Sequence, residues 1–201
     1  MKRDIIQAIL FDFGGVLAEE GFEEGLKAIG KQKGVDPESF FHTASEIIHE
    51  SHYVTGLSDE KTYWSSVRRQ TGVTGTDREF REEIIKRFAL RPTMIAHAIA
   101  FSRRGLTIGI LSDQTDWLDE IDKRTPFYEH FDYVFNSYKM NKSKRDPSVF
   151  RDVCSIMGRI PSEVLFVDDN KGNIERATRE GLKTIHFRSI KGFEEQMRAY
   201  A

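Results

Sequence analysis

The chain has little of several features that mark particular classes of protein. Among its 201 residues there is one cysteine, so no disulfide can form within the chain. No apolar run approaches the roughly 20 residues that a helix needs to cross a bilayer. Basic and acidic residues number 30 and 32, a formal net charge of −2, so there is no basic surplus for nucleic acid. We therefore expect no nucleic-acid partner and no membrane span.

Further absences concern export and metal binding. Residues 1–4 lead straight into an apolar segment without a small-residue cleavage site, so we predict no signal peptide and a cytoplasmic location. Cys154 lies in an amphipathic helical pattern, which favours a buried, inert thiol. The six histidines are scattered without metal-ligand spacing, which argues against a zinc site.

Five short apolar runs are typical of buried strands. They cover residues 5–12, 106–111, 133–135, 164–167 and 184–187. Helical patterns separate the later runs, and strands that alternate with helices favour a parallel, doubly wound sheet. The sequence therefore predicts an α/β fold with a Rossmann-like core.

Between the first two runs the pattern is helical throughout. Helix start signals stand at Asp36, Asp59 and Thr76, the first followed by proline at the first helical position. Four helices without an intervening strand predict a small all-α insert at 18–94, in a core domain formed by 1–17 and 95–201. Four aromatic residues of the insert stand at the helical spacing that is more typical of a core than of a cleft: Phe41, Tyr53, Tyr63 and Trp64.

Carboxylates follow two of the predicted strands directly. Asp12 ends the first run and precedes Gly14 and Gly15, while Asp168 and Asp169 end the fourth. Ligands of open α/β sheets bind beyond the carboxyl ends of the strands, and glycines let the backbone approach a bound group closely. Although an aspartate after a strand also commonly begins a turn, two such strand ends together predict a Mg²⁺ site.

Ser112 and Lys144 follow the second and third predicted strands. With the two acidic strand ends, the segments 11–17, 111–113, 144–150 and 166–170 resemble, in this order, the four motifs of the haloacid dehalogenase-like superfamily. The insert stands where that superfamily carries a helical cap. Its size and the return segment 90–92 are similar to the epoxide-hydrolase N-terminal-like and glucose-1-phosphate-phosphatase-like branch.

The resemblance implies a Mg²⁺-dependent phosphatase that acts on a small phosphorylated metabolite. Asp12 would be the nucleophile and form an aspartyl-phosphate. Ser112 and Lys144 would bind and stabilise the transferring phosphoryl group, in a pocket shared with Gly15 and with Asp113, which stands where the family usually has asparagine.

The same resemblance implies the metal ligands. Asp12, Asp169 and the backbone carbonyl of Gly14 would hold Mg²⁺, and Asp168 would be a further ligand or would support one. Taken alone, Ser112 also fits an ordinary strand end, and Lys144 fits a solvated basic loop.

Gly14 departs from the family pattern. Its position usually holds a second aspartate, which protonates the leaving oxygen and later activates water. Without it we expect a weaker enzyme that favours good leaving groups, such as acyl or anomeric phosphates. Glu19 or Glu20 can in principle supply the acid, although charges in such a linker are more often solvated.

Two other functions remain open at this stage. A 2-haloacid dehalogenase would use the same nucleophile without metal, but it would carry an aromatic residue at the Gly14 position and lack the paired acids. A catalytically silent binding or regulatory protein would keep the fold without turnover, and Gly14 is its main support. The sequence identifies neither the substrate nor the oligomeric state.

Overall fold

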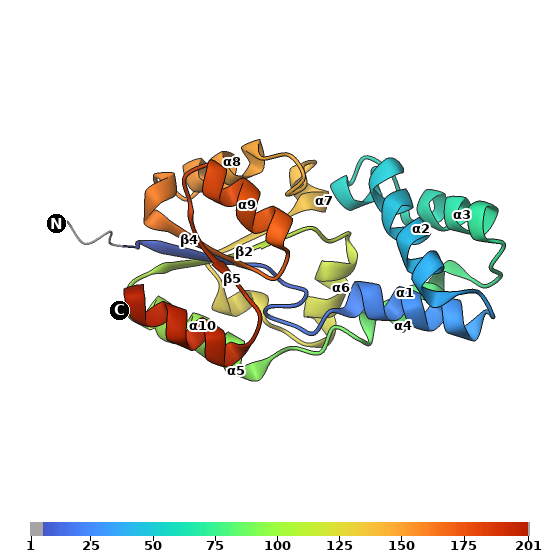
Figure 1. Cartoon of the computed structure of the whole chain (residues 1–201), viewed down its shortest axis with the longest axis horizontal. Coiled ribbons are helices and arrows are strands. Elements are labelled where there is room, and N and C mark those ends of the chain that lie inside the picture. Colours follow the sequence, from blue (N-terminus) through green and yellow to red (C-terminus); the bar gives the residue numbers. More distant parts are fainter. Residues whose placement is uncertain (1–5, 201) are drawn as a thin grey trace.

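Five parallel strands form one sheet at the centre of the structure, a computed structural model that describes residues 6–200 (Figure 1). The strands are β1 (Ala8–Phe11), β2 (Thr107–Ser112), β3 (Tyr133–Asn136), β4 (Val164–Asp168) and β5 (Lys183–His186). Their order in the sheet is β3-β2-β1-β4-β5, and every neighbouring pair is parallel. The predicted α/β fold with a doubly wound parallel sheet is confirmed. The expectations for residues 1–5, including the start of the first strand, lie outside the described residues.

Helices cover both faces of the sheet, which is why its strands are apolar without alternation. Ile9 and Phe11 point to the face that is covered by α5 (Pro92–Arg103), α6 (Trp117–Arg124) and α10 (Ile190–Met197). Ala8 and Leu10 point to the other face, which is covered by α8 (Ser148–Ile156) and α9 (Lys171–Arg179). Figure 1 shows these two helical layers above and below the strands.

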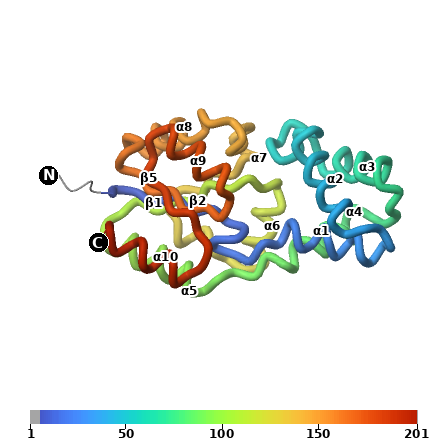
Figure 2. Tube along the Cα trace, viewed as in Figure 1, coloured from blue at the N-terminus to red at the C-terminus, as the bar shows by residue number. Residues whose placement is uncertain are grey.

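Four further helices stand between β1 and α5, as predicted. They are α1 (Gly21–Gln32), α2 (Pro37–Glu50), α3 (Glu60–Thr71) and α4 (Asp77–Ile85). The side chains of Asp36, Asp59 and Thr76 each accept a hydrogen bond from a backbone N–H in the first turn of α2, α3 and α4. These caps satisfy donors that a helix start leaves free. Figure 2 shows the four helices together at one end of the molecule, beside the sheet.

The two crossings between these helices and the sheet run side by side. Ala18 and Leu90 form an antiparallel bridge, the N–H of Glu19 donates to the carbonyl of Ala89 at 2.8 Å, and that of Arg91 donates to Leu17 at 2.8 Å. A second contact lies near α7 (Ser137–Met140), where the hydroxyl of Ser137 donates to the carbonyl of Val54 at 2.7 Å. The helices also meet the core at α6, where the hydroxyl of Tyr53 donates to Asp116 at 2.5 Å and Trp64 stacks on Trp117. The domain boundaries at 17/18 and 94/95 stay a prediction.

The structure bears on three expectations from the sequence, which concern Cys154, the aromatic residues of the insert and membrane-spanning helices. Cys154 is buried within α8, as predicted, and burial raises the pKa of its thiol to about 11. That the thiol is inert stays a prediction. Tyr53, Tyr63 and Trp64 are core residues with no exposed surface. Across residues 6–200, none of the helices combines the length and apolar character that spanning a membrane requires. The cytoplasmic location stays a prediction.

Candidate active site

Asp12 is held at the carboxyl end of β1, in the middle of the sheet. Its backbone N–H donates to the carbonyl of Val167 at 2.8 Å, which continues the pairing of β1 with β4. Its Oδ1 accepts the N–H of Phe13 at 2.7 Å, and its Oδ2 lies 2.8 Å from the Nζ of Lys144. Burial raises the pKa of Asp12 well above its usual value, while Lys144 opposes the rise.

Lys144 is buried between two carboxylates. Its Nζ lies 2.8 Å from Oδ2 of Asp12 and 2.7 Å from Oδ2 of Asp168, and the side chain is 2% exposed. Burial alone would lower the pKa of Lys144, but Asp12, Asp168 and Asp113 together raise it, so the side chain remains an ammonium. The interpretation of Lys144 as part of a solvated basic loop is therefore wrong. Its loop folds inward because the backbone N–H of Lys144 donates to the carboxylate of Asp113 at 2.9 Å.

Asp168 ends β4 and is fully buried. Besides Lys144, its carboxylate accepts the backbone N–H of Asn170 at 2.7 Å and the side-chain amide of Asn173 at 3.0 Å. Asn173 stands in the first turn of α9, where the cap residue Asn170 fixes the start of the helix. The sequence analysis did not single out Asn173. The available signal was its position five residues after Asp168, in the first turn of a helix.

Asp169 lies beside Asp12 and Asp168, and its carboxylate packs against Gly15. Asp12, Asp168 and Asp169 each offer a carboxylate oxygen, and these atoms lie within 4.8 Å of one another. A Cβ at Gly15 would lie 2.1 Å from Oδ2 of Asp169, and the φ of Gly15 is +75°, so only glycine allows this approach. The structure thus places Gly15 against Asp169, whereas Gly14 lines the cavity above Asp12.

The three carboxylates fit a hard divalent cation. Oxygen donors are what Mg²⁺ and Ca²⁺ prefer, and Mg²⁺ takes one or two carboxylates with water completing the shell. Burial raises the pKa of Asp169, and the carboxylate of Asp168 raises it further. Lys144 forms ion pairs with two of the three carboxylates, and the charge of Arg91 acts on Asp169. Among the described residues, three carboxylates thus face one ammonium in direct contact, which favours a bound cation.

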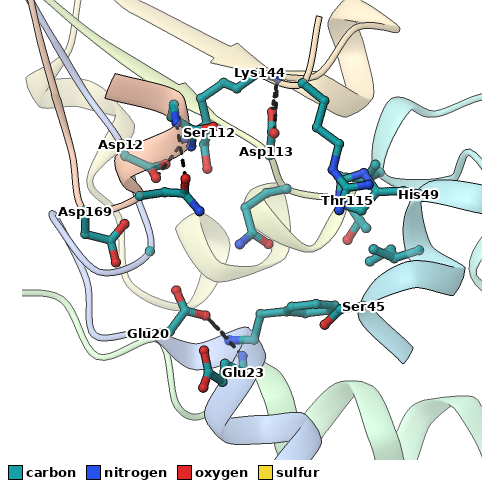
Figure 3. A pocket seen from close by; sticks show the side chains of 18 of the residues that line it. Asp12, Glu20, Glu23, Ser45, His49, Ser112, Asp113, Thr115, Lys144 and Asp169 are labelled. Carbon is teal, nitrogen blue, oxygen red and sulfur yellow. Dashed lines mark hydrogen bonds and ion pairs between the residues drawn. The ribbon is translucent and has the colours of Figure 1, made fainter. Parts of the chain in front are cut away.

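A cavity of about 410 Å³ opens above the cluster (Figure 3). Ser112, at the end of β2, is 1% exposed as a residue and lines the cavity near Asp12. The sheet side of the wall brings together most of the predicted site residues: Asp12, Gly14, Ser112, Asp113, Lys144 and Asp169. Arg176 of α9, which was not predicted, also lines it and donates from Nε to the carbonyl of Lys144 at 2.7 Å. The basic residue near the site therefore holds the lysine loop in place.

The opposite wall comes from the four-helix insert. Phe22 of α1 and Phe41, Ser45, Ile48 and His49 of α2 face the strand ends across the cavity. Of the four aromatic residues considered from the sequence, Phe41 is therefore the one that lines the cavity. This wall is partly apolar and partly polar, so the cavity suits a ligand with both kinds of surface.

The two linker glutamates have different surroundings. Glu19 is exposed and forms an ion pair with Arg91 at 2.8 Å, so the expectation of a solvated charge holds for this residue. Glu20 lines the cavity, and its Oε1 accepts the backbone N–H groups of Phe22 and Glu23. Burial raises the pKa of Glu20. Glu20 is therefore partly buried in the cavity wall, and its carboxyl group is held at the start of α1.

Residues 6–179 match the family model of haloacid dehalogenase-like hydrolases. The chain belongs to this family. The predicted resemblance is thus confirmed, and the match covers every strand end that carries a site residue. The sequence of this haloacid dehalogenase-like hydrolase is also similar to those of named proteins.

The chain is 30% identical to bifunctional epoxide hydrolase 2 of Rattus norvegicus over 113 residues, which are 53% of this chain and 20% of the rat protein. It is thus similar to about a fifth of that longer protein. It is 24% identical to D-ribitol-5-phosphate phosphatase of Bacteroides thetaiotaomicron over 192 residues, which are 90% of this chain and 91% of the phosphatase.

Solved structures share the fold. A haloacid dehalogenase-like family enzyme of Bacteroides thetaiotaomicron aligns with a TM-score of 0.77 and 22% identity, covering 96% of this chain and 99% of the enzyme. A second structure of that enzyme, in complex with magnesium and inorganic phosphate, aligns with a TM-score of 0.70 and 20% identity over 92% and 96% of the two chains.

Proposed function

We propose that this hydrolase is a Mg²⁺-dependent phosphatase that hydrolyses a small phosphorylated metabolite through an aspartyl-phosphate at Asp12. The observation that carries the proposal is the buried ion pair of 2.8 Å between Asp12 and Lys144, set beside two further carboxylates at the floor of a cavity. A buried carboxylate that faces a cavity and is oriented by an ammonium suits nucleophilic attack on phosphorus. The ribitol-phosphate phosphatase relative and the magnesium and phosphate complex of the structural neighbour support the same chemistry.

Each residue of the site has a different role in the proposed reaction, which follows from its position. Oδ1 of Asp12 accepts a backbone N–H, which fixes the carboxylate, and Oδ2, which is oriented by its ion pair with Lys144, would be the attacking oxygen. Lys144 and the hydroxyl of Ser112 stabilise the charge that the phosphoryl oxygens carry in the transition state. Asp168, whose carboxylate is already bonded to Lys144 and Asn173, holds the lysine in place.

Asp12, Asp169 and, as the family resemblance suggests, the carbonyl of Gly14 would hold Mg²⁺. When bound, the ion neutralises charge on the phosphoryl oxygens and orients them. The cavity of about 410 Å³ fits a small metabolite, and a pocket of this size lies in the usual range for small ligands. Its helical wall would set the choice of substrate.

The proposal is tested by two assays, covalent labelling with acetyl phosphate and hydrolysis of a panel of metabolite phosphates, each with and without Mg²⁺. The wild-type protein should become phosphorylated and release phosphate only with Mg²⁺, and Asp12→Asn should do neither. Lys144→Ala should lower kcat/KM by about 10²–10³, the typical loss when one preorganised charge is removed from an active site.

Lys142→Ala provides the matched control for the lysine. Lys142 belongs to the same basic run, but its Nζ is bonded to Ser148 and Asp152 on the surface. We expect near-wild-type turnover for this variant. If the wild-type protein is neither phosphorylated nor active on any substrate of the panel, the catalytically silent protein considered above becomes the better interpretation.

A further inference from the structure

We propose that Glu20 takes the place of the aspartate that is missing at Gly14, and that its carboxyl group passes the proton to the leaving oxygen and later takes one from water. The inference rests on the proposed phosphatase function and concerns a residue outside the four family motifs. If it holds, the enzyme is not restricted to activated phosphates, and unactivated alkyl phosphates, such as the terminal phosphates of sugars and polyols, become suitable substrates.

The position of the carboxyl group carries this proposal. A Cβ built at Gly14 would lie 3.0 Å from Oε2 of Glu20 and 3.9 Å from its Cδ. The carboxyl group of Glu20 therefore occupies the space that the side chain of an aspartate at position 14 would enter. Both residues line the same cavity as Asp12.

The local structure orients this carboxyl group. Glu20 is the N-cap of α1, and its Oε1 accepts the N–H of Phe22 at 3.0 Å and of Glu23 at 3.1 Å. Nothing in the described part of the chain donates a hydrogen bond to Oε2, which faces Gly14. Figure 3 shows Glu20 rising from the start of α1 toward Asp12 and Asp169. An N-cap needs one oxygen, so the second oxygen is left for another task.

Glu20 is also separate from the metal cluster. The carboxylates that can share a cation in the described chain are those of Asp12, Asp168 and Asp169. Glu19, the neighbour in sequence, is turned away to Arg91 at the surface. Of the two linker glutamates, Glu20 alone lines the cavity above Asp12.

The proposed chemistry has two balanced steps. In the first, an oxygen of Asp12 bonds to phosphorus, the bond between phosphorus and the ester oxygen breaks, and the proton of Glu20 moves to that oxygen, so the alcohol leaves neutral. In the second, the Glu20 carboxylate takes a proton from water while the water oxygen bonds to phosphorus. The bond between Asp12 and phosphorus then breaks, and both side chains return to their initial states.

Glu20→Gln is the decisive variant, because glutamine keeps an Oε1 acceptor for the start of α1 but cannot exchange a proton. Its kcat/KM for an alkyl phosphate should fall by about 10²–10⁴, the usual worth of general acid–base catalysis. With acetyl phosphate, whose leaving group needs no proton, phosphorylation should fall far less. Because water is then activated poorly, the phosphorylated protein should accumulate, which intact-protein mass spectrometry measures.

Glu19→Gln is the matched control and should keep the wild-type dependence on the leaving group. If Glu20→Gln turns over alkyl phosphates like the wild type without accumulating phosphorylated protein, Glu20 is not the acid and the inference is overturned while the phosphatase stands. If the wild-type protein is never phosphorylated, the proposed function and this inference fail together.

An exchange of carboxylates tests whether the two positions share one space. Gly14, unlike Gly15, has no positive φ, so an aspartate at this position meets no backbone strain of that kind. Adding Gly14→Asp to Glu20→Ala should restore part of the lost alkyl phosphatase activity. In the presence of Glu20 the same change should gain little, since the new Cβ would crowd Oε2. Equal gains in both backgrounds would contradict a shared position.

Discussion

His49 is a residue whose ionisation depends on its place in the cavity wall. Burial, and to a smaller extent the guanidinium of Arg145, lower the pKa of its imidazole from 6.5 to about 4. Between about pH 4 and 6.5 the unfolded chain therefore binds more protons at this position than the folded chain. The stability that comes from a neutral, half-buried His49 is complete above pH 6.5 and is lost as the pH falls toward 4.

We predict that His49→Asn makes the free energy of unfolding less dependent on pH within that window. Urea unfolding at a series of pH values measures the change. His42→Asn, at an exposed position of the same helix, is the control and should keep the wild-type profile. A profile of His49→Asn identical to that of the wild type would show that the imidazole is solvated in both states.

Single residues also show which parts of the site could be predicted from the sequence and which could not. Asp12, Ser112 and Asp169 could be predicted because each ends or follows a recognisable strand, and parallel strands bring those ends together. Lys144 and Glu20 appeared solvated because their neighbours in sequence are charged. The backbone N–H of Lys144 bonds to the carboxylate of Asp113, and the carboxylate of Glu20 bonds to the N–H of Phe22. The composition of a charged run does not indicate which of its side chains makes such contacts.

At the scale of elements, the helices that were predicted are those with a visible start signal or a long apolar period. Those that were missed are short: α6 and α10 have eight residues each and α7 has four. The cap position of α6, Asp116, makes no side-chain hydrogen bond to the helix start. Such segments are stabilised by tertiary packing, which a local pattern does not contain. Phe193 of α10 packs against Phe11 of β1. Trp117 of α6 packs against Tyr53 and Trp64 of the helical insert.

The packing of α1 on α4 leads to a prediction about Gly25. A Cβ at this position would lie 2.7 Å from both Cα and Cγ1 of Ile84, so the two helices touch through a glycine. Gly25→Ala should therefore destabilise the protein by about 1–3 kcal/mol, as overpacking usually does, although alanine is the better helix former. Chemical denaturation followed by circular dichroism measures this difference.

The control for Gly25 is Gly192→Ala in α10, where the new Cβ would meet one side-chain oxygen at 3.2 Å and no backbone atom. We expect that variant to be at least as stable as the wild type, because propensity then outweighs a mild contact. If Gly25→Ala were equally well tolerated, α1 and α4 would have room to separate. The helical wall of the cavity would then be less rigid than the close contact of Gly25 with Ile84 indicates.

At the scale of the whole molecule, the cavity lies between two parts that meet at the paired crossings, at α6 and near α7. The sheet supplies the acidic cluster and Lys144, while α1 and α2 supply Glu20 and the wall that faces them. Sequence predicted both parts, since each has its own periodicity. It could not predict their contacts, such as the bond from Ser137 to Val54, because these join residues that are 83 positions apart.

The acidic cluster also predicts how the whole molecule responds to a cation. A ligand that binds only the folded state at 100 times its Kd adds about 2.7 kcal/mol to stability. For a chain of this size, each kcal/mol raises Tm by about 2–4 °C, so saturating Mg²⁺ should raise Tm by about 5–10 °C. Asp169→Asn should abolish the shift, because it removes a ligand and part of the excess negative charge.

Without Mg²⁺, Asp169→Asn should melt at or above the wild-type temperature, because Asp168 and Asp169 no longer repel each other. Thermal melts with Mg²⁺ and with a chelator give both comparisons. Asp152→Asn, which loses only a surface ion pair with Lys142, is the control and should shift with Mg²⁺ like the wild type. A full Mg²⁺ shift in Asp169→Asn would place the ion elsewhere on the molecule and would remove the metal from the proposed phosphatase site.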